Sequence, residues 1–155
     1  AIDEVALSAG IKGMIVGQVV DIEAENREIS LDELKFIHWH KTGALFCAAM
    51  RSGAILAGAK KPQLEALTEY AEQFGLAFQI TDDILDVIGD EKKLGKPIGS
   101  DVKNHKPTYP ALIGLEKAKI QAEEAVERAI QSLNIFNSDA DPLREMAKLI
   151  IAREN

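Results

Sequence analysis

The fold is decided by the stretch Gly75-Leu-Ala-Phe-Gln-Ile-Thr-Asp-Asp-Ile-Leu-Asp-Val-Ile-Gly89, which is mostly apolar but carries three aspartates. At a helical spacing of about 100° per residue, the aspartates share roughly a third of the circumference with three other residues. This acidic stripe consists of Glu72, Gly75, Gln79, Asp82, Asp83 and Asp86. Apolar side chains occupy the remaining circumference, so we expect a mostly buried helix.

The acidic stripe is typical of two different surroundings. Burying carboxylates beside so much apolar surface is costly unless a positive group neutralises them, and Asp82 and Asp86, one turn apart, point toward a common position. Oxygen ligands with positions left for water or phosphate favour Mg²⁺ over Zn²⁺ or Ca²⁺. Spacing alone leaves the alternative open, which is a solvated charged face at the start of a loop.

The composition indicates a globular protein with one core. The chain has 155 residues, of which 46% are hydrophobic and 28% are charged. Its net charge of −7 disfavours nucleic acids and anionic membranes as partners. We find no apolar run that is long and uncharged enough to span a bilayer, so no membrane insertion is expected. The single Cys47 excludes an internal disulfide and favours a cytoplasmic location.

A helix with a face of small residues is expected over residues 3–25. The face consists of Ala6, Gly10, Gly13 and Gly17. Glycine costs roughly 1 kcal/mol relative to alanine inside a helix, so this face implies close approach of another backbone or a ligand. A second, polar stripe consists of Gln18, Asp21 and Glu25, for which ordinary solvent exposure is the alternative.

Cap signals and amphipathic spacing predict helices in the rest of the chain. Ser30 and Glu33 have the form of a capping box before a helix over residues 31–57. Pro62 suits the first position of the helix that ends at Gly89, and later helices follow, the last over residues 142–151. No segment alternates with period 2, so the fold class is all-α, with antiparallel helices joined by short turns.

Lysines accompany the acidic stripe. Lys41 shares a helical face with His38 and apolar residues, so it either reaches the edge of the protein or points at an anion. His38 and His40 lack neighbours at metal-ligand spacing, and we interpret both as structural. Five lysines oppose three acidic residues between Gly89 and Pro110. This glycine-hinged loop suits closure over a metal-bound phosphate, and a disordered surface loop is the alternative.

Six motifs follow one another in order along nearly the whole chain. They are Gly17-Gln18 with Asp21, His40-Lys41-Thr42-Gly43-Ala44-Leu45, Phe78-Gln79-x-x-Asp82-Asp83-x-x-Asp86, Gly95-Lys96-Pro97, Gly99-Ser-Asp101 and Lys106-x-Thr-Tyr-Pro110. Together they resemble the C-terminal half of the short-chain trans-prenyl diphosphate synthases, above all those of the bacterial farnesyl type. The resemblance implies that residues 1–155 are the C-terminal part of a single helical domain of the isoprenoid synthase type, without its N-terminal part.

The resemblance also implies a reaction, in which isopentenyl diphosphate condenses with an allylic diphosphate such as dimethylallyl or geranyl diphosphate. Ionisation assisted by Mg²⁺ would give farnesyl or a similar short-chain prenyl diphosphate. The implied metal ligands are Asp82, Asp83 and Asp86, and the implied diphosphate- and substrate-binding residues are Lys41, Lys96, Lys106 and Gln18. Lys41, Thr42 and Gln79 are implied in catalysis, with Lys41 on the diphosphate and the oxygens of Thr42 and Gln79 near the allylic cation. Catalysis would be electrostatic rather than by proton transfer.

Several family elements have no counterpart in these 155 residues, namely the first aspartate-rich motif and the N-terminal basic motif. We therefore expect the chain to begin inside a larger protein and to be inactive alone. Apolar faces over residues 31–57 and 62–89 predict self-association, as a homodimer, and the loop from Gly89 to Lys106 is expected to be mobile without ligand. A non-catalytic prenyltransferase subunit and half of a terpene cyclase are the alternatives.

Overall fold

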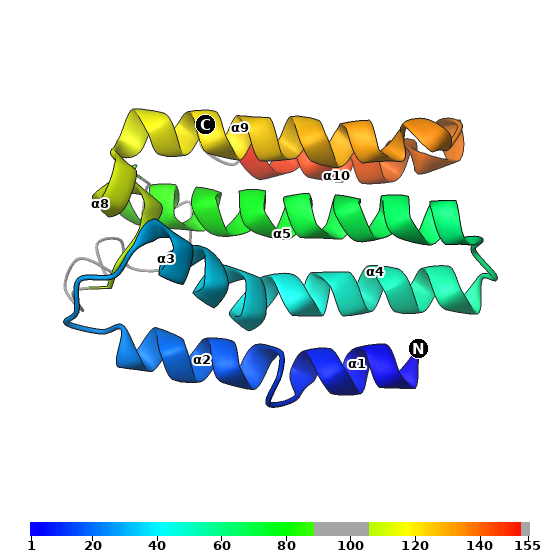
Figure 1. The fold of residues 1–155 in the computed structure, drawn as a ribbon. Coiled ribbons are helices and arrows are strands. Elements are labelled where there is room, and N and C mark those ends of the chain that lie inside the picture. The colour runs from blue at the N-terminus through cyan, green and yellow to red at the C-terminus, as the bar shows by residue number, and fades with distance from the viewer. Residues whose placement is uncertain (89–105, 153–155) are drawn as a thin grey trace.

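Helices account for all the regular secondary structure in residues 1–88 and 106–152, which are the residues that the computed structural model describes (Figure 1). The α-helices are α1 (Ile2–Ala9), α2 (Met14–Glu23), α3 (Leu31–His38), α4 (Ala44–Leu56), α5 (Lys61–Ile88), α8 (Tyr109–Ile113), α9 (Leu115–Ser132) and α10 (Asp141–Ala152). A π-helical turn, η1 (Trp39–Gly43), joins α3 to α4, and the 3-10 turns η2 (Leu133–Ile135) and η3 (Ser138–Ala140) precede α10. The predicted all-α fold class is confirmed.

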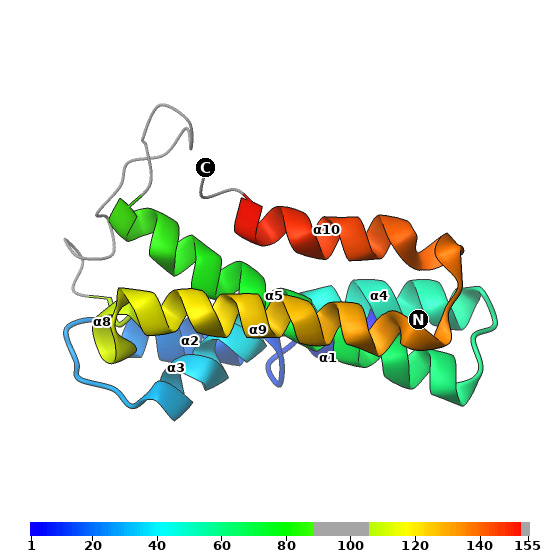
Figure 2. The ribbon, with the colours of Figure 1, turned by 90° about the horizontal axis from the view of Figure 1, so that it is seen from above.

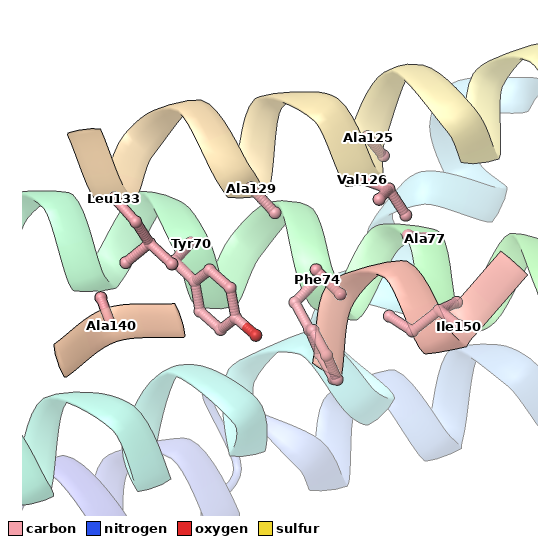
Figure 3. Packing of buried hydrophobic residues seen from close by; sticks show 10 residues of the cluster. Tyr70, Phe74, Ala77, Ala125, Val126, Ala129, Leu133, Ala140 and Ile150 are labelled. Carbon is pink, nitrogen blue, oxygen red and sulfur yellow. The ribbon is translucent and has the colours of Figure 1, made fainter. Parts of the chain in front are cut away.

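The long helix α5 lies between α9 on one side and α4 on the other, and successive long helices run antiparallel (Figure 1). The helix α10 then returns alongside α9 (Figure 2). Small residues of α9 allow α5 to come close, because Ala125 and Ala129 pack against Tyr70 and Phe74 in one core cluster (Figure 3). The Tyr70 hydroxyl, at the edge of that cluster, donates a 2.7 Å hydrogen bond to the Leu143 carbonyl.

A second core cluster holds the other end of α5. It brings Ile80 and Ile84 of α5 together with Leu34 and Ile37 of α3 and with Tyr109 of α8. The helix α3 begins at the predicted capping box, in which the Glu33 amide donates to Ser30 Oγ at 3.1 Å and the Ser30 amide donates to Glu33 Oε2 at 3.2 Å. This cluster lies beside the acidic end of α5 and therefore supports the candidate site.

Two predicted helices are interrupted. The helix predicted over residues 3–25 breaks between Ala9 and Met14, where two glycines occur in the connecting turn. The helix predicted over residues 31–57 is divided by η1, whose wider turn brings Gly43 against the Trp39 ring. Both corrections have the same cause, since glycines lower the cost of leaving regular α-helical geometry.

One segment passes the length and composition test for a membrane span, which corrects the expectation that none would. It is Ile2–Glu23, and 11% of its most apolar window is buried. A single such helix is weak evidence for a membrane span because core helices of other proteins pass the same test. The turn between α1 and α2 interrupts this segment.

Gly17 brings the backbone of α2 onto η1. A Cβ atom at this position would overlap the Lys41 backbone and would lie 2.7 Å from the Lys41 Cα. The expectation that glycines in this segment mark close backbone approach is therefore confirmed at Gly17, and the approaching backbone belongs to the same chain. Gly10 and Gly13 instead meet carbonyls of α1 itself, and Ala6 is exposed, so only part of the small-residue face is covered.

A methyl group at Gly17 must therefore displace backbone. We expect Gly17→Ala to lower the free energy of unfolding by about 3 kcal/mol, at the upper end of overpacking costs, because a helix backbone cannot move aside as a side chain can. Gly53→Ala in α4 is the matched control, since nothing lies within 4 Å of its added Cβ. It should raise stability by about 0.5–1 kcal/mol. Urea unfolding measures both, and equal effects would contradict the close contact.

Candidate functional site

The carboxylates of the acidic stripe differ in their surroundings. Asp86 is 2% exposed and Asp83 is 8% exposed, whereas Asp82 is half-buried. The expected burial of this face is thus confirmed for two of the three, and a fully solvated face is excluded for them. Within residues 1–88 and 106–152, no group of three or more His, Cys, Asp or Glu side chains is arranged to hold a metal ion.

Asp83 connects α5 to the beginning of α8. Its Oδ2 accepts a 2.9 Å hydrogen bond from the Tyr109 backbone amide and lies 3.8 Å from His38 Nε2. The His38 and Tyr109 rings stack with their centroids 5.5 Å apart. Burial raises the pKa of Tyr109 to about 12, and the charge of Asp83 acts in the same direction. Asp83 therefore holds three segments together.

His38 is neutral at physiological pH. Burial lowers its pKa to about 4, and this effect outweighs the nearby carboxylates of Asp21 and Asp82, which act to raise it. Lys41 acts in the same direction as burial. The expectation that His38 is structural agrees with this burial. Because the charges of Asp21, Lys41 and Asp82 all act on His38, the segments that carry them, α2, η1 and α5, meet around this side chain.

Asp21 of α2 binds two lysines with a single oxygen. Lys41 Nζ donates to Asp21 Oδ2 at 2.7 Å, and Lys106 Nζ donates to the same oxygen at 3.3 Å. Burial by itself raises the pKa of Asp21, but the hydrogen bond and charge of Lys41, with those of Lys106, outweigh it and hold the pKa below its ordinary value. Glu25 lies farther away, 3.9 Å from Lys106 Nζ. Lys41 thus points at a charged cluster.

The remaining predicted residues lie in different surroundings. Thr42 is half-buried in η1, Gln79 is half-buried in α5, and Gln18 is exposed on α2. Lys96 lies outside the described residues, as does the rest of the predicted loop before Lys106. Cys47 is buried as predicted, and burial raises its pKa to about 12, so it remains a thiol rather than a nucleophilic thiolate.

Sequence reasoning missed two features of this site. It included Asp21 in a family motif but gave it no role, although its position one turn after Gly17 places it on the face that meets η1. It also found no carboxylate beside His38, because Asp83 is far away in sequence. Only the tertiary arrangement brings these groups together.

Comparison with known proteins gives consistent matches. The model of the polyprenyl synthetase family matches residues 5–148. The chain is 46% identical to a geranylgeranyl diphosphate synthase of Cyanophora paradoxa over 99% of this chain and 52% of the relative. It is 48% identical to the farnesyl diphosphate synthase of Escherichia coli (strain K12) over 98% of this chain and 52% of the relative. The chain spans about half the length of the curated relatives it matches.

Solved structures give the same match. A geranyltransferase from Helicobacter pylori, complexed with magnesium and isoprenyl diphosphate, superposes with a TM-score of 0.80 at 32% sequence identity. The match covers 97% of this chain and 50% of that chain. The helical arrangement described above is therefore shared with these enzymes over almost all of this chain.

The neutral His38 makes stability depend on pH. Its ordinary pKa of 6.5 in the unfolded chain exceeds the value of about 4 in the folded chain, so the unfolded chain binds more protons between these values. Stability should be complete above pH 6.5 and should fall by about 3 kcal/mol as the pH drops to 4. Urea unfolding across this range should show a shallower fall for His38→Asn, and identical slopes would contradict the burial of a neutral imidazole.

Proposed function

This chain belongs to the polyprenyl synthetase family, and from this premise we propose that it forms part of the active site of a prenyltransferase. The reaction that we propose joins isopentenyl diphosphate to an allylic diphosphate, giving farnesyl or a similar short-chain prenyl diphosphate. The observation that carries the proposal is the pair of ammonium groups, from Lys41 and Lys106, that meets at Asp21. His38, which is within electrostatic range of Asp21 and Lys41, links this pair to α5 because its Nε2 lies 3.8 Å from Asp83. A cationic pair next to carboxylates suits a diphosphate together with a divalent metal.

The lysines act on the leaving group in this proposal. Lys41 and Lys106 bind the diphosphate of the allylic substrate and stabilise the negative charge that develops as the carbon–oxygen bond breaks. Lys96 joins them by family resemblance. Their charge is fixed before the reaction, so the contribution is electrostatic and requires no proton transfer.

Asp82, Asp83 and Asp86 are the residues that would hold Mg²⁺. The donor set fits this ion, because it consists of oxygens and because Mg²⁺ commonly takes only one or two carboxylates and completes its shell with water and substrate phosphate. The described residues bring no three carboxylate, imidazole or thiol groups together around one point, so water and substrate phosphate would have to complete the metal's shell. When bound, Mg²⁺ withdraws charge from the leaving diphosphate. Since Asp83 also accepts the Tyr109 amide, its main contribution is to fix α5 against α8.

Neutral side chains are proposed to surround the allylic cation. Thr42 and Gln79 supply oxygen dipoles, which stabilise a cation without capturing it as a free carboxylate could. Gln18 lies on the exposed side of α2 and is proposed to contact substrate.

The product length is also a proposal. The relatives include enzymes named for farnesyl and for geranylgeranyl diphosphate, so their names do not fix one chain length, and we propose a short-chain product of the farnesyl type. A cytoplasmic location is proposed from the buried thiol of Cys47.

The alternatives are less well supported. A subunit without catalytic function has no need to keep Asp83 and Asp86 buried, because buried carboxylates are costly. A terpene cyclase shares the ionisation step, but the relatives named above are synthases of linear prenyl diphosphates. Product analysis separates the two enzymes, since a cyclase releases a hydrocarbon or alcohol ring.

A chimera tests the proposed activity. In this chimera the chain replaces the matching half of the Escherichia coli enzyme, to which it is 48% identical. We expect the chimera to convert isopentenyl and allylic diphosphates with Mg²⁺, and Asp82→Ala to lower kcat by about a hundredfold, equivalent to roughly 3 kcal/mol. The KM for isopentenyl diphosphate should change little, because the lost contact acts mainly on the transition state.

Two controls accompany the chimera. Glu124→Ala removes an exposed carboxylate of α9 and should leave kcat unchanged, while the 155-residue chain alone should show no turnover. An unchanged kcat in the Asp82→Ala chimera would contradict the assignment of Asp82 as a metal ligand. A folded chimera that transfers no prenyl group would contradict the proposed function itself.

Self-association is a separate proposal, supported by exposed apolar side chains. The segments expected to present apolar faces, over residues 31–57 and 62–89, expose Leu56, Val87 and Ile88 among others. Further exposed apolar side chains lie on α1 and α2 and in the turn between them, notably Ile2, Leu7, Ile11 and Ile22. Burying such side chains between two copies is favourable, so we expect a dimer. Sedimentation equilibrium at micromolar concentration should give twice the chain mass of 16.9 kDa. A stable monomer would contradict this proposal and would leave the chimera experiment unaffected.

A further inference from the structure

A single carboxylate oxygen receives ammonium groups from two distant parts of the chain. Asp21 Oδ2 lies 2.7 Å from Lys41 Nζ and 3.3 Å from Lys106 Nζ. Because both distances end on the same oxygen, the two nitrogens lie no more than 6.0 Å apart. Two like charges at this separation repel, and the carboxylate between them makes the arrangement favourable.

The packing of α2 fixes this carboxylate in place. Gly17 lets the α2 backbone rest against Lys41, and Asp21 follows one helical turn later on the same face. The Asp21 side chain is only 16% exposed, and Lys41 and Lys106 are partly buried as well. Surface ion pairs contribute little to stability because their side chains are mobile and solvated. The side chains of this cluster are less solvated, since all three are partly buried.

We propose that Asp21 is a positioning residue that sets the spacing of Lys41 and Lys106 for one diphosphate. The proposal rests on the proposed function, since it assigns both lysines to the same diphosphate. Each ammonium group carries three N–H donors, and the contact with Asp21 uses one of them. The other donors can bind phosphate oxygens while Asp21 stays in place, so the lysines are ordered before substrate arrives.

The opposite role of Asp21, as a competitor of the anion, predicts a different sign. A carboxylate that only neutralised the lysines would have to be displaced, and Asp21→Asn would then tighten diphosphate binding. A positioning carboxylate predicts weaker binding, because its loss lets the two ammonium groups move apart. The sign of one substitution therefore separates the two roles.

Lysine labelling tests on this chain whether Asp21 restrains the two ammonium groups. An amine-reactive reagent, followed by peptide mass spectrometry, gives the labelling rates of Lys41 and Lys106 relative to Lys61, whose side chain is 87% exposed. We expect Asp21→Asn to raise both rates by about threefold or more, since the charge-assisted bonds are lost. Inorganic diphosphate with Mg²⁺ should protect both lysines, and the half-protecting concentration should rise about tenfold in Asp21→Asn.

Matched variants complete the experiment. Glu25→Gln removes the weaker carboxylate near Lys106 and should shift the half-protecting concentration less than about twofold. Asp21→Glu keeps the charge but moves it, so its half-protecting concentration should lie between those of the wild type and Asp21→Asn. This graded response would not follow from a general loss of stability, which would also raise the labelling rate of Lys119 on α9, whose side chain is 32% exposed in the folded chain.

Three results would overturn the proposal in distinguishable ways. Unchanged labelling of both lysines in Asp21→Asn would show that the carboxylate does not hold them in solution. Faster labelling with tighter diphosphate binding would make Asp21 a competitor. If diphosphate protects neither lysine in the wild-type chain while Asp21→Asn still labels faster, the diphosphate site of the proposed function fails and Asp21 is reduced to a structural bridge.

Discussion

The backbones of α2 and η1 touch at Gly17 and Lys41, and the charged cluster exists because they do. A side chain at Gly17 would separate the two segments and carry Asp21 away from Lys41. A similar contact joins η1 to α5, where a Cβ on Gly75 would lie 3.2 Å from the Gly43 Cα. Three segments therefore approach one another closely at glycines, where a side chain would have no room.

The electrostatics at this junction follow from what is buried. His38 is neutral because burial lowers its pKa to about 4, so it adds no positive charge beside Asp83. Asp83 is instead stabilised by the Tyr109 amide. The ammonium groups of Lys41 and Lys106 are thus the cations placed at the Asp21 side of the junction. This separation of cationic and acidic groups agrees with a role in holding a diphosphate and a metal next to each other.

The sequence predicted what depends on neighbours within a few turns. Helical periodicity, the capping box at Ser30 and the buried character of Asp83 and Asp86 are local or near-local, and all were confirmed. The interruption of the helix over residues 31–57 was not predicted, because a glycine only permits such a turn and the close approach of Gly43 to Gly75 of α5 appears only in the tertiary structure. Asp21 and Lys106 are 85 residues apart in the chain, so their contact could not be predicted from the sequence. The sequence therefore predicted Lys106 as a site residue but not its contact with Asp21.

The central claim is that Lys41 and Lys106 jointly bind one diphosphate beside the aspartates of α5. A crystal structure of this chain grown with Mg²⁺ and inorganic diphosphate tests it most directly. The account predicts one diphosphate in contact with both ammonium groups, with a metal ion between it and the carboxylates of Asp82 and Asp86. A diphosphate bound away from these lysines, or a metal ion that contacts none of the α5 aspartates, would contradict it.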